Sequence, residues 1–231
     1  MAIKADGSRR RSTMSSGTTA SLVTAQILEL IGDGTLKAGQ RLGEPELARR
    51  LGVGTVPVRE ALRTLAGDGV VDIVPNSGAT VHKMSAQEIA DTLKGIVGLL
   101  KVALDELQPA DIVELLPRLN EIASDMHAEQ TRGNALATLR AFAEFQLTII
   151  HASGNAYIER VVRRVHFHYY LHQVLDYVAP TAFGPIAASH VQIIECLADG
   201  RYKKAGTIFD ACVNIVCDHL GGRGHRTRKS L

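Results

Sequence analysis

The stretch that decides the fold is Leu47-Ala48-Arg49-Arg50-Leu51-Gly52-Val53-Gly54-Thr55-Val56-Pro57-Val58-Arg59-Glu60-Ala61-Leu62. Its first half ends a short helical pattern over residues 44–51, which opens with acids and a proline and can close at Gly52. A second pattern follows over residues 55–66 after a turn of only three residues. Two short helices joined by a tight glycine turn predict a helix-turn-helix.

The residues on either side of this stretch complete a small domain. Upstream, apolar residues recur at helical spacing from Val23 to Ile31 and stop before Gly32, which predicts a first helix. Downstream, apolar residues alternate through Val71 and Ile73, a turn follows at residues 75–78, and the alternation resumes to Val81. This pattern predicts a β-hairpin. Residues 19–83 are therefore expected to form a winged helix-turn-helix of three helices and a hairpin.

The rest of the chain has helical patterns only, interrupted by Pro, Gly and Asn. The expected helices cover residues 85–107, 111–131, 135–152, 155–178, 183–199 and 201–220. The predicted fold is thus mainly α, with the winged domain followed by an all-α bundle of about six helices at residues 84–220. The basic segments 1–18 and 221–231 have little to bury and are expected to be disordered tails.

Composition narrows the class of protein. The chain has 231 residues, 45% of them hydrophobic, and a formal net charge of +2, so nucleic-acid binding would need local clustering of Lys and Arg. Its three cysteines form no CxxC pair, which fits neither a disulfide framework nor a zinc finger. The sequence has neither a signal-peptide pattern nor an apolar run long enough to span a bilayer. We therefore expect a cytoplasmic protein without a membrane partner.

The second helix of the helix-turn-helix is the candidate DNA-reading element. A helical projection of residues 55–66 places Val58, Ala61, Leu62 and Leu65 on one side and leaves Thr55, Val56, Arg59 and Arg63 on the other. A guanidinium can take guanine O6 and N7 in the major groove or brace phosphates. The alternative is a solvated helix face, but the glycine turn and the hairpin favour the DNA-binding interpretation.

The quoted stretch closely resembles the GntR superfamily, whose motif runs LAxxLGVSRTPVREAL. Residues 36–42 resemble that family's "lkPGerL", and residues 75–81 resemble its wing tip. His151-Ala152-Ser153-Gly154-Asn155 and the all-α pattern resemble the FadR-type group, which carries a helical FCD effector-binding domain. The resemblance spans most of residues 20–220 and is stronger in the first domain than in the second.

This resemblance implies a homodimer that binds a palindromic double-stranded operator, usually as a repressor, and releases it when a small-molecule effector enters the second domain. The sequence departs from the family at Gly54-Thr55-Val56, where Ser-Arg-Thr is usual. Val56 could contact a thymine methyl instead, and Thr55 could hydrogen-bond a base edge or a phosphate. The predicted DNA-binding set is Arg49, Thr55, Val56, Arg59, Arg63 and Gly78.

The same resemblance locates an effector pocket. Many FCD domains hold a divalent metal through an Asp, a His four residues later and two further His, positions that fall here at Phe142, Gln146, His190 and Cys212. Only His190 and Cys212 could ligate a metal, so we expect neither a metal nor another cofactor. Together with Ile96, where the family often carries an Arg, these residues predict a pocket for a rather apolar effector, although such residues are also typical of plain core.

The segment 163–172 is rich in histidine and has two open interpretations. His168 and His172 lie four residues apart, and with His166 they could bind metal or sense pH. The rival function is therefore a metal-dependent enzyme or metal sensor that uses this helix. No HExxH motif accompanies the histidines, so we expect no enzyme activity and favour histidines at a surface or a dimer interface.

Overall fold

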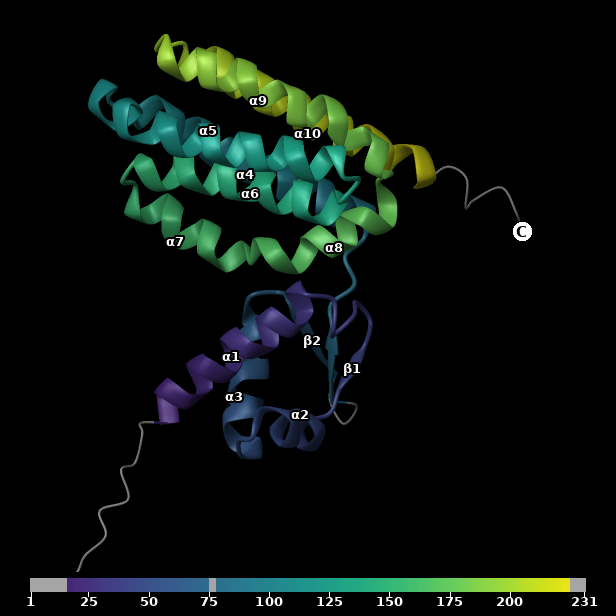
Figure 1. The fold of residues 1–231 in the computed structure, drawn as a ribbon. Helices are drawn as coiled ribbons and strands as arrows, with labels where there is room; N and C mark the ends of the chain where they lie inside the picture. Colours follow the sequence, from purple (N-terminus) through teal and green to yellow (C-terminus); the bar gives the residue numbers. More distant parts are fainter. Residues whose placement is uncertain (1–15, 75–77, 225–231) are drawn as a thin grey trace, which may run out of the picture.

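The computed structural model of the chain describes residues 16–74 and 78–224. The tails at 1–15 and 225–231 and the centre of the wing turn at 75–77 lie outside the described residues. Figure 1 shows two parts, a small winged domain and a larger helical domain. They meet where the helices α7 (Ala156–Val165) and α8 (Phe167–Tyr177) face the winged domain.

The winged domain follows the order that the sequence predicts. It consists of α1 (Ser16–Gly32), β1 (Arg41–Leu42), α2 (Glu44–Leu51), α3 (Thr55–Gly67), β2 (Val71–Val74) and β3 (Gly78–Val81). Gly52 ends α2 in the left-handed conformation at φ 67°, and its N–H bonds back to the carbonyls of the last helical turn. The helix-turn-helix and the wing are thereby confirmed.

The structure differs from the predicted element boundaries in three places, two of them in the winged domain. β1 was not expected; it pairs antiparallel with β3, so the sheet has the order β1-β3-β2 rather than a lone hairpin. Helix α1 begins at Ser16, within the segment predicted as a tail. At the other end, the last helix continues to Gly224, past the predicted start of the C-terminal tail. A two-residue strand and fraying helix ends leave little periodic signal in a sequence.

The helical domain packs long helices side by side (Figure 1). Helix α4 (Ala86–Glu106) starts at a capping box, in which Ser85 accepts from the Glu88 N–H and the Glu88 carboxylate accepts from the Ser85 N–H. The helix α5 packs on α6 and α9, and α10 packs on α4 and α9. The remaining elements are α5 (Pro109–Thr131), α6 (Ala135–Ala152), α7 (Ala156–Val165), α8 (Phe167–Tyr177), the 3-10 turn η1 (Pro180–Ala182), α9 (Phe183–Ala198) and α10 (Tyr202–Gly224).

The helix expected over residues 155–178 is in fact two helices. His166 has φ 48°, in the left-handed region that is unusual for a residue with a side chain, and it separates α7 from α8. No glycine or proline marks the break, so periodicity alone could not find it. After the break, α8 packs against α1 of the winged domain.

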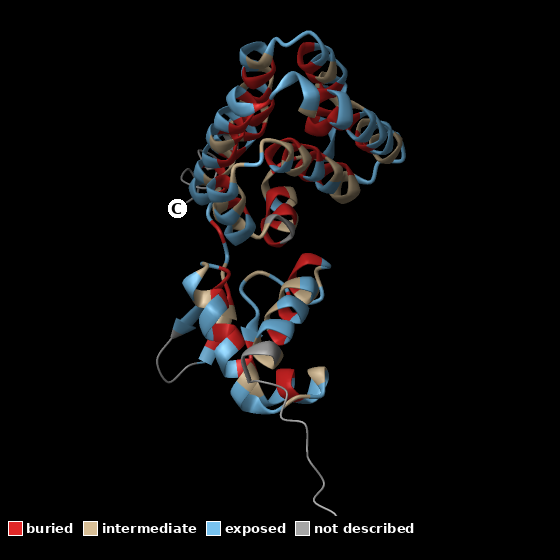
Figure 2. Ribbon diagram, turned by 90° about the vertical axis from the view of Figure 1, so that its left-hand side faces the viewer, coloured by how far each residue is buried: buried red, intermediate tan, exposed pale blue. Residues whose placement is uncertain are grey.

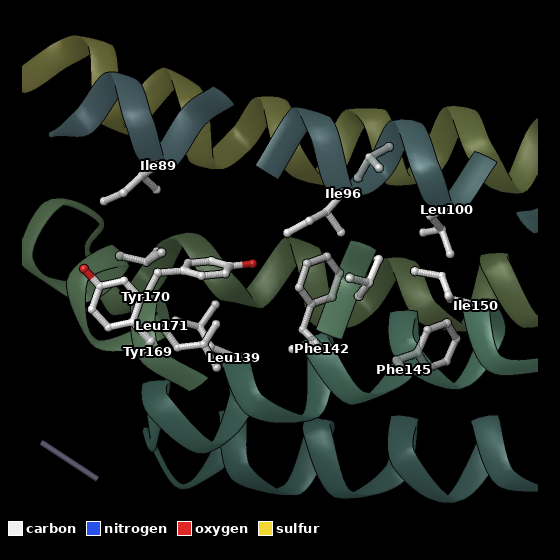
Figure 3. Close-up of a cluster of buried hydrophobic side chains, with 14 of the residues drawn as sticks. Ile89, Ile96, Leu100, Leu139, Phe142, Phe145, Ile150, Tyr169, Tyr170 and Leu171 are labelled. Atoms are coloured by element: carbon white, nitrogen blue, oxygen red, sulfur yellow. The ribbon is translucent and has the colours of Figure 1, made fainter. Parts of the chain in front are cut away.

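Buried residues lie mainly on the inward-facing sides of the helices in both domains (Figure 2). In the helical domain, Ile89, Ile96 and Leu100 of α4 point toward α6 and α8, where Phe142, Phe145 and Tyr170 meet them (Figure 3). No helix among residues 16–74 and 78–224 is both long and apolar enough to cross a membrane.

Candidate nucleic-acid interface and buried polar site

Helix α3 has the two-sided character that the sequence predicts. Val58, Ala61, Leu62 and Leu65 are buried with at most 2% exposure, which confirms the predicted inner side. Thr55, Val56, Arg59 and Arg63 are exposed on the helix, and 61% of Val56 is open to solvent. Most of this valine side chain at the start of α3 is therefore available to a partner surface.

Arg59 is not a free cation. Its Nε donates to both carboxylate oxygens of Glu44 at 3.0 Å, and its Nη2 donates to Glu44 Oε2 at 2.7 Å. This hydrogen bond lowers the pKa of Glu44, and the Glu44 carboxylate raises the pKa of Arg59. The pair joins the first turn of α2 to the first turns of α3. One edge of the guanidinium is therefore already occupied within the protein.

Arg63 lies one turn further along the same face. Its charge contributes to lowering the pKa of Glu44, so it lies near that carboxylate, yet no carboxylate of the described segments forms an ion pair with it. Its guanidinium fork can therefore take two acceptors of a base or phosphate at once. The sequence did not single out Glu44, because fifteen residues separate it from Arg59 and no local spacing connects them.

The wing supplies a further cation. Gly78 opens β3 with φ 89°, and a Cβ placed there would lie 3.8 Å from Arg41 Nε. Arg41 is exposed on β1, the strand that the sequence did not predict. Arg49 is also exposed, in the last turn of α2. In Figure 1, α2 and the strand ends that flank residues 75–77 lie at the end of the winged domain farthest from the helical bundle.

The five predicted pocket residues lie in the core of the helical domain. They come from α4, α6, α9 and α10, and each is at most 7% exposed: Ile96, Phe142, Gln146, His190 and Cys212. The His190 ring is fully buried and meets two aromatic rings edge-on, Phe142 at 5.3 Å and Phe145 at 4.5 Å between centroids. Phe145 was not predicted as part of this site.

His190 has one satisfied and one unsatisfied nitrogen. Nδ1 lies 2.8 Å from the Ile186 carbonyl, so Nδ1 carries the proton and donates it. Nε2 is buried and has no hydrogen-bond partner in the described part of the chain. Burial lowers the pKa of His190 to about 4, so the ring is neutral near pH 7. A lone pair on Nε2 therefore faces an apolar interior without a donor, an arrangement that costs stability unless something occupies it.

The residues around His190 do not fit a metal ion. Phe142 and Gln146 occupy the positions at which the resemblance places an Asp and a His ligand, and Phe142 has no ligand atom. Burial also raises the pKa of the Cys212 thiol, which disfavours the thiolate ligand. Within residues 16–74 and 78–224, no three His, Cys, Asp or Glu side chains gather closely enough to hold a metal.

Two histidines of the segment 163–172 contact the winged domain rather than a metal or a free surface. His172 Nε2 lies 2.9 Å from the Gly32 carbonyl at the end of α1, and His166 Nε2 lies 3.0 Å from Asp68 Oδ2 after α3. Both partners belong to the winged domain, so these two histidines form contacts between the domains. The side chain of His168 lies outside the described part of the structure.

Comparison with known proteins gives a consistent result. Residues 19–81 match the model of bacterial regulatory proteins, gntR family, and residues 103–214 match the FCD domain. The chain is 25% identical over 201 residues to the HTH-type transcriptional regulator YdhC of Bacillus subtilis, covering 84% of this chain and 88% of that protein. It is 30% identical over 125 residues to the HTH-type transcriptional regulator McbR of Escherichia coli, covering 52% and 55% of the two chains.

Solved structures agree on the fold. A Rhodococcus sp. RHA1 protein described as a GntR regulator superposes with a TM-score of 0.76 at 22% identity, over 89% of this chain and 98% of its own. McbR/YncC of E. coli superposes with a TM-score of 0.71 at 19% identity, over 89% and 98% of the two chains. At these identities the likeness concerns the arrangement of both domains and nothing finer.

Proposed function

Because the chain belongs to the gntR family of bacterial regulatory proteins and carries an FCD domain, it is a transcriptional regulator, and we propose that it works as an effector-responsive repressor. Related proteins described as repressors support this sign of regulation. The gluconate operon transcriptional repressor of B. subtilis is 26% identical over 64% of this chain. We place the protein in the cytoplasm, where its DNA partner is.

The proposed DNA contact divides its tasks among the residues of α3 and the wing. Arg63 reads a base edge, because its fork is not held by a carboxylate of the described residues. Arg59, held along one edge by Glu44, braces a phosphate with its remaining N–H groups. Thr55 and Val56 meet the bases at the helix start, while Arg49 and the wing at Gly78, with Arg41 beside it, contact the backbone or minor groove.

We propose that the protein binds as a homodimer to a palindrome. A two-fold symmetric protein matches a two-fold symmetric operator, and half-sites lie about one helical turn apart. Sedimentation of the free protein and of its complex with a selected duplex measures this directly. A complex with one chain per duplex would contradict the proposal.

The observation that carries the effector proposal is the buried Nε2 of His190, which has a lone pair and no donor in the described chain. The surrounding rings and Ile96 are apolar. We therefore propose an effector that is mostly apolar and presents one hydrogen-bond donor, such as a hydroxyl or amide N–H, to His190. A doubly charged acid does not suit this site, because it would be buried without a cation to pair with.

Gel shifts over a range of salt test the DNA proposal. With a duplex selected from a random library, we expect Arg63→Ala to lose about tenfold or more in affinity and to relax base preference at one position. Arg160→Ala is the matched control, because Arg160 is exposed on α7 and packs on Tyr157 in the helical domain. Equal affinity of the two variants would show that Arg63 does not read the operator.

A thermal-shift screen tests the effector proposal. A ligand of the folded state raises the melting temperature, and the effect should be lost in His190→Leu. Metal analysis of the dialysed protein should find well under one ion per chain. Stoichiometric zinc, or effectors that act equally on His190→Leu, would contradict the proposed pocket.

A further inference from the structure

The helix α8 is the main contact of the helical domain with the winged domain. The Tyr169 hydroxyl donates to the His82 carbonyl at 2.5 Å, and Tyr177 donates to the Met84 carbonyl at 3.0 Å. Gln173 is buried between them; it donates to the His82 carbonyl and accepts from the Met84 N–H at 2.8 Å. These contacts fix the backbone of residues 82–84, the short link between the two domains.

The side chain of His82 bridges the domains at this link. Its Nδ1 lies 2.9 Å from Asp72 Oδ2 on β2 of the wing, and its Nε2 lies 3.2 Å from Glu88 Oε1 in the first turn of α4. A carboxylate accepts and cannot donate, whereas a neutral imidazole has only one N–H. Both contacts are therefore hydrogen bonds only when His82 is an imidazolium. When the ring is neutral, one nitrogen presents a lone pair to a carboxylate and that contact becomes repulsive.

The surroundings of His82 favour the charged ring. A cleft of about 790 Å³ opens beside it, so water and protons reach the site. Burial alone lowers the pKa of His82, but the hydrogen bonds and charges of Asp72 and Glu88 together outweigh burial and raise it above the ordinary value. Further charged or titratable groups border the same cleft from the turn after α3, α4, α7 and α8: Asp68, Asp91, Arg164 and Tyr169, with His166 paired to Asp68. Three carboxylates besides Asp72 thus face one arginine.

We propose that His82 is a proton-dependent positioning residue, whose imidazolium ties the wing strand β2 to the first turn of α4 and so fixes the winged domain against the effector domain. The tie between the domains stands without DNA, whereas its effect on operator affinity rests on the proposed function. A winged domain held in one orientation loses less freedom on binding, so the clamped protein binds its operator more tightly. Operator affinity then falls as the pH rises through the titration of His82.

The proposed role of His82 differs from the release of DNA on effector binding. It acts at the link between the domains and uses no residue of the His190 pocket. It also gives the link two kinds of attachment. The Tyr169 and Gln173 bonds go to the backbone carbonyl of His82 and do not depend on its protonation. Only the contacts to Asp72 and Glu88 do. Deprotonation therefore loosens the wing strand relative to α4 without detaching the link from α8.

The first measurement follows the proton without DNA. In the full-length protein labelled at histidine, we expect the ring signal of His82 to titrate above the ordinary histidine pKa of about 6.5. The control position for the variants is His127, which is exposed on α5. Asp72→Asn and Glu88→Gln should each lower the midpoint for His82, and Gln at position 88 can still cap α4. A midpoint for His82 at or below that ordinary value would overturn the proposal.

The second measurement follows the clamp, by which we mean the contacts of the His82 ring with Asp72 on β2 and Glu88 on α4. Hydrogen-exchange protection of β2 and of the first turn of α4 should fall between pH 6.0 and pH 8.5 in the wild-type protein, after correction for the intrinsic rate. His82→Gln should remove this pH dependence, whereas His127→Gln should retain it. Equal pH dependence in both variants would overturn the proposal even if the His82 midpoint is raised. Because hydrogen exchange is measured without DNA, it tests the role of His82 even if no operator is found. Failure of the His82 proposal can therefore be told apart from failure of the repressor proposal.

The third measurement adds the selected duplex. We expect wild-type affinity to fall about fivefold from pH 6.0 to pH 8.5, the lower range of typical coupling between sites. His127→Gln should show the same fall, and His82→Gln less than twofold. An undiminished fall in His82→Gln would show that the clamp does not act on DNA binding.

Discussion

Arg59 shows how one carboxylate changes what a recognition residue can do. In the free protein, Glu44 takes the Nε edge of the guanidinium, the edge that also suits a guanine or a phosphate. Both side chains are partly exposed, at 53% and 32%, so the pair contributes little to stability. Its effect is on the direction of Arg59 and on the charge that the surface presents to phosphates.

We predict that Glu44→Gln strengthens binding to unrelated duplexes more than binding to a selected operator. Removing one negative charge beside Arg59 and Arg63 raises the local positive potential, and the affinity gain should be about threefold and disappear at high salt. Titrating both duplexes at several salt concentrations measures this. The control is Glu114→Gln, a charge change on exposed α5. A larger gain for the operator than for unrelated DNA would mean that Glu44 opposes specific contacts.

His190 predicts a second effect at the scale of a residue. An unfolded histidine titrates near pH 6.5, whereas the buried ring has a pKa of about 4. Between these values the unfolded chain binds more protons than the folded one, so the free energy of unfolding falls as the pH is lowered. His190 alone accounts for at most about 3 kcal/mol of this loss.

Urea unfolding of wild-type protein and His190→Leu at pH 7 and at pH 4.5 checks this prediction. The variant should lose clearly less stability on acidification, and the difference between the two proteins isolates His190 from other titrating groups. His127→Gln should behave as the wild type. Identical acid losses in wild-type protein and His190→Leu would mean that the ring accepts a proton inside the folded domain.

At the scale of elements, two glycines in similar open space should respond oppositely to the same substitution. Gly98 lies inside α4 and a Cβ there meets no atom within 4 Å; Gly52 also has open space but ends α2 with φ 67°. Gly98→Ala should raise the free energy of unfolding by about 1 kcal/mol through helix propensity, and Gly52→Ala should lower it by a similar amount through backbone strain. Denaturant unfolding measures both. Loss of stability in Gly98→Ala would show that a partner chain covers that face of α4.

The elements that the sequence predicts well are those with local signals. Gly52, Gly54 and the prolines mark the ends of α2 and α3 within a few residues, and the apolar stripe of α3 was placed correctly. β1 and the break at His166 were missed, because a two-residue strand exists only through its pairing with β3, and His166 carries no sequence sign of a left-handed conformation.

The candidate site likewise has a part that the sequence predicts and a part that depends on tertiary contacts. His190 and its neighbours were located through family resemblance, but the unsatisfied Nε2 depends on how Phe142 and Phe145 enclose the ring. The role of His172 could not be predicted at all, since its partner Gly32 lies 140 residues earlier. Contacts between domains have no periodicity for a sequence to show.

At the scale of the whole molecule, the end of α1 is held by the helical domain. The Gly32 carbonyl accepts from Arg140 Nη2 at 2.7 Å and from His172 Nε2 at 2.9 Å. It belongs to the last turn of α1, where carbonyls lack partners within the helix and carry partial negative charge. Arg140 stands on α6, the helix that also carries Phe142 and Gln146, and α1 packs against α3. The Arg140 bond therefore connects α6 directly to α1, the helix on which α3 packs, and we expect a displacement of α6 to move α1 with it.

We predict that removing both donors frees the end of α1 without unfolding either domain. In the double variant Arg140→Met, His172→Leu, amide exchange in the last turn of α1 and in residues 33–36 should speed up about tenfold, the equivalent of one to two lost hydrogen bonds. Arg160→Met controls for loss of an arginine from the same domain, because the Arg160 side chain packs on Tyr157 of its own helix. Each single variant should show a smaller effect, because the other donor still occupies the carbonyl. If the double variant exchanges at the wild-type rate, Gly32 does not couple the two domains, and the coupling would have to run through their other contacts, such as His166 with Asp68 and His82 with Glu88.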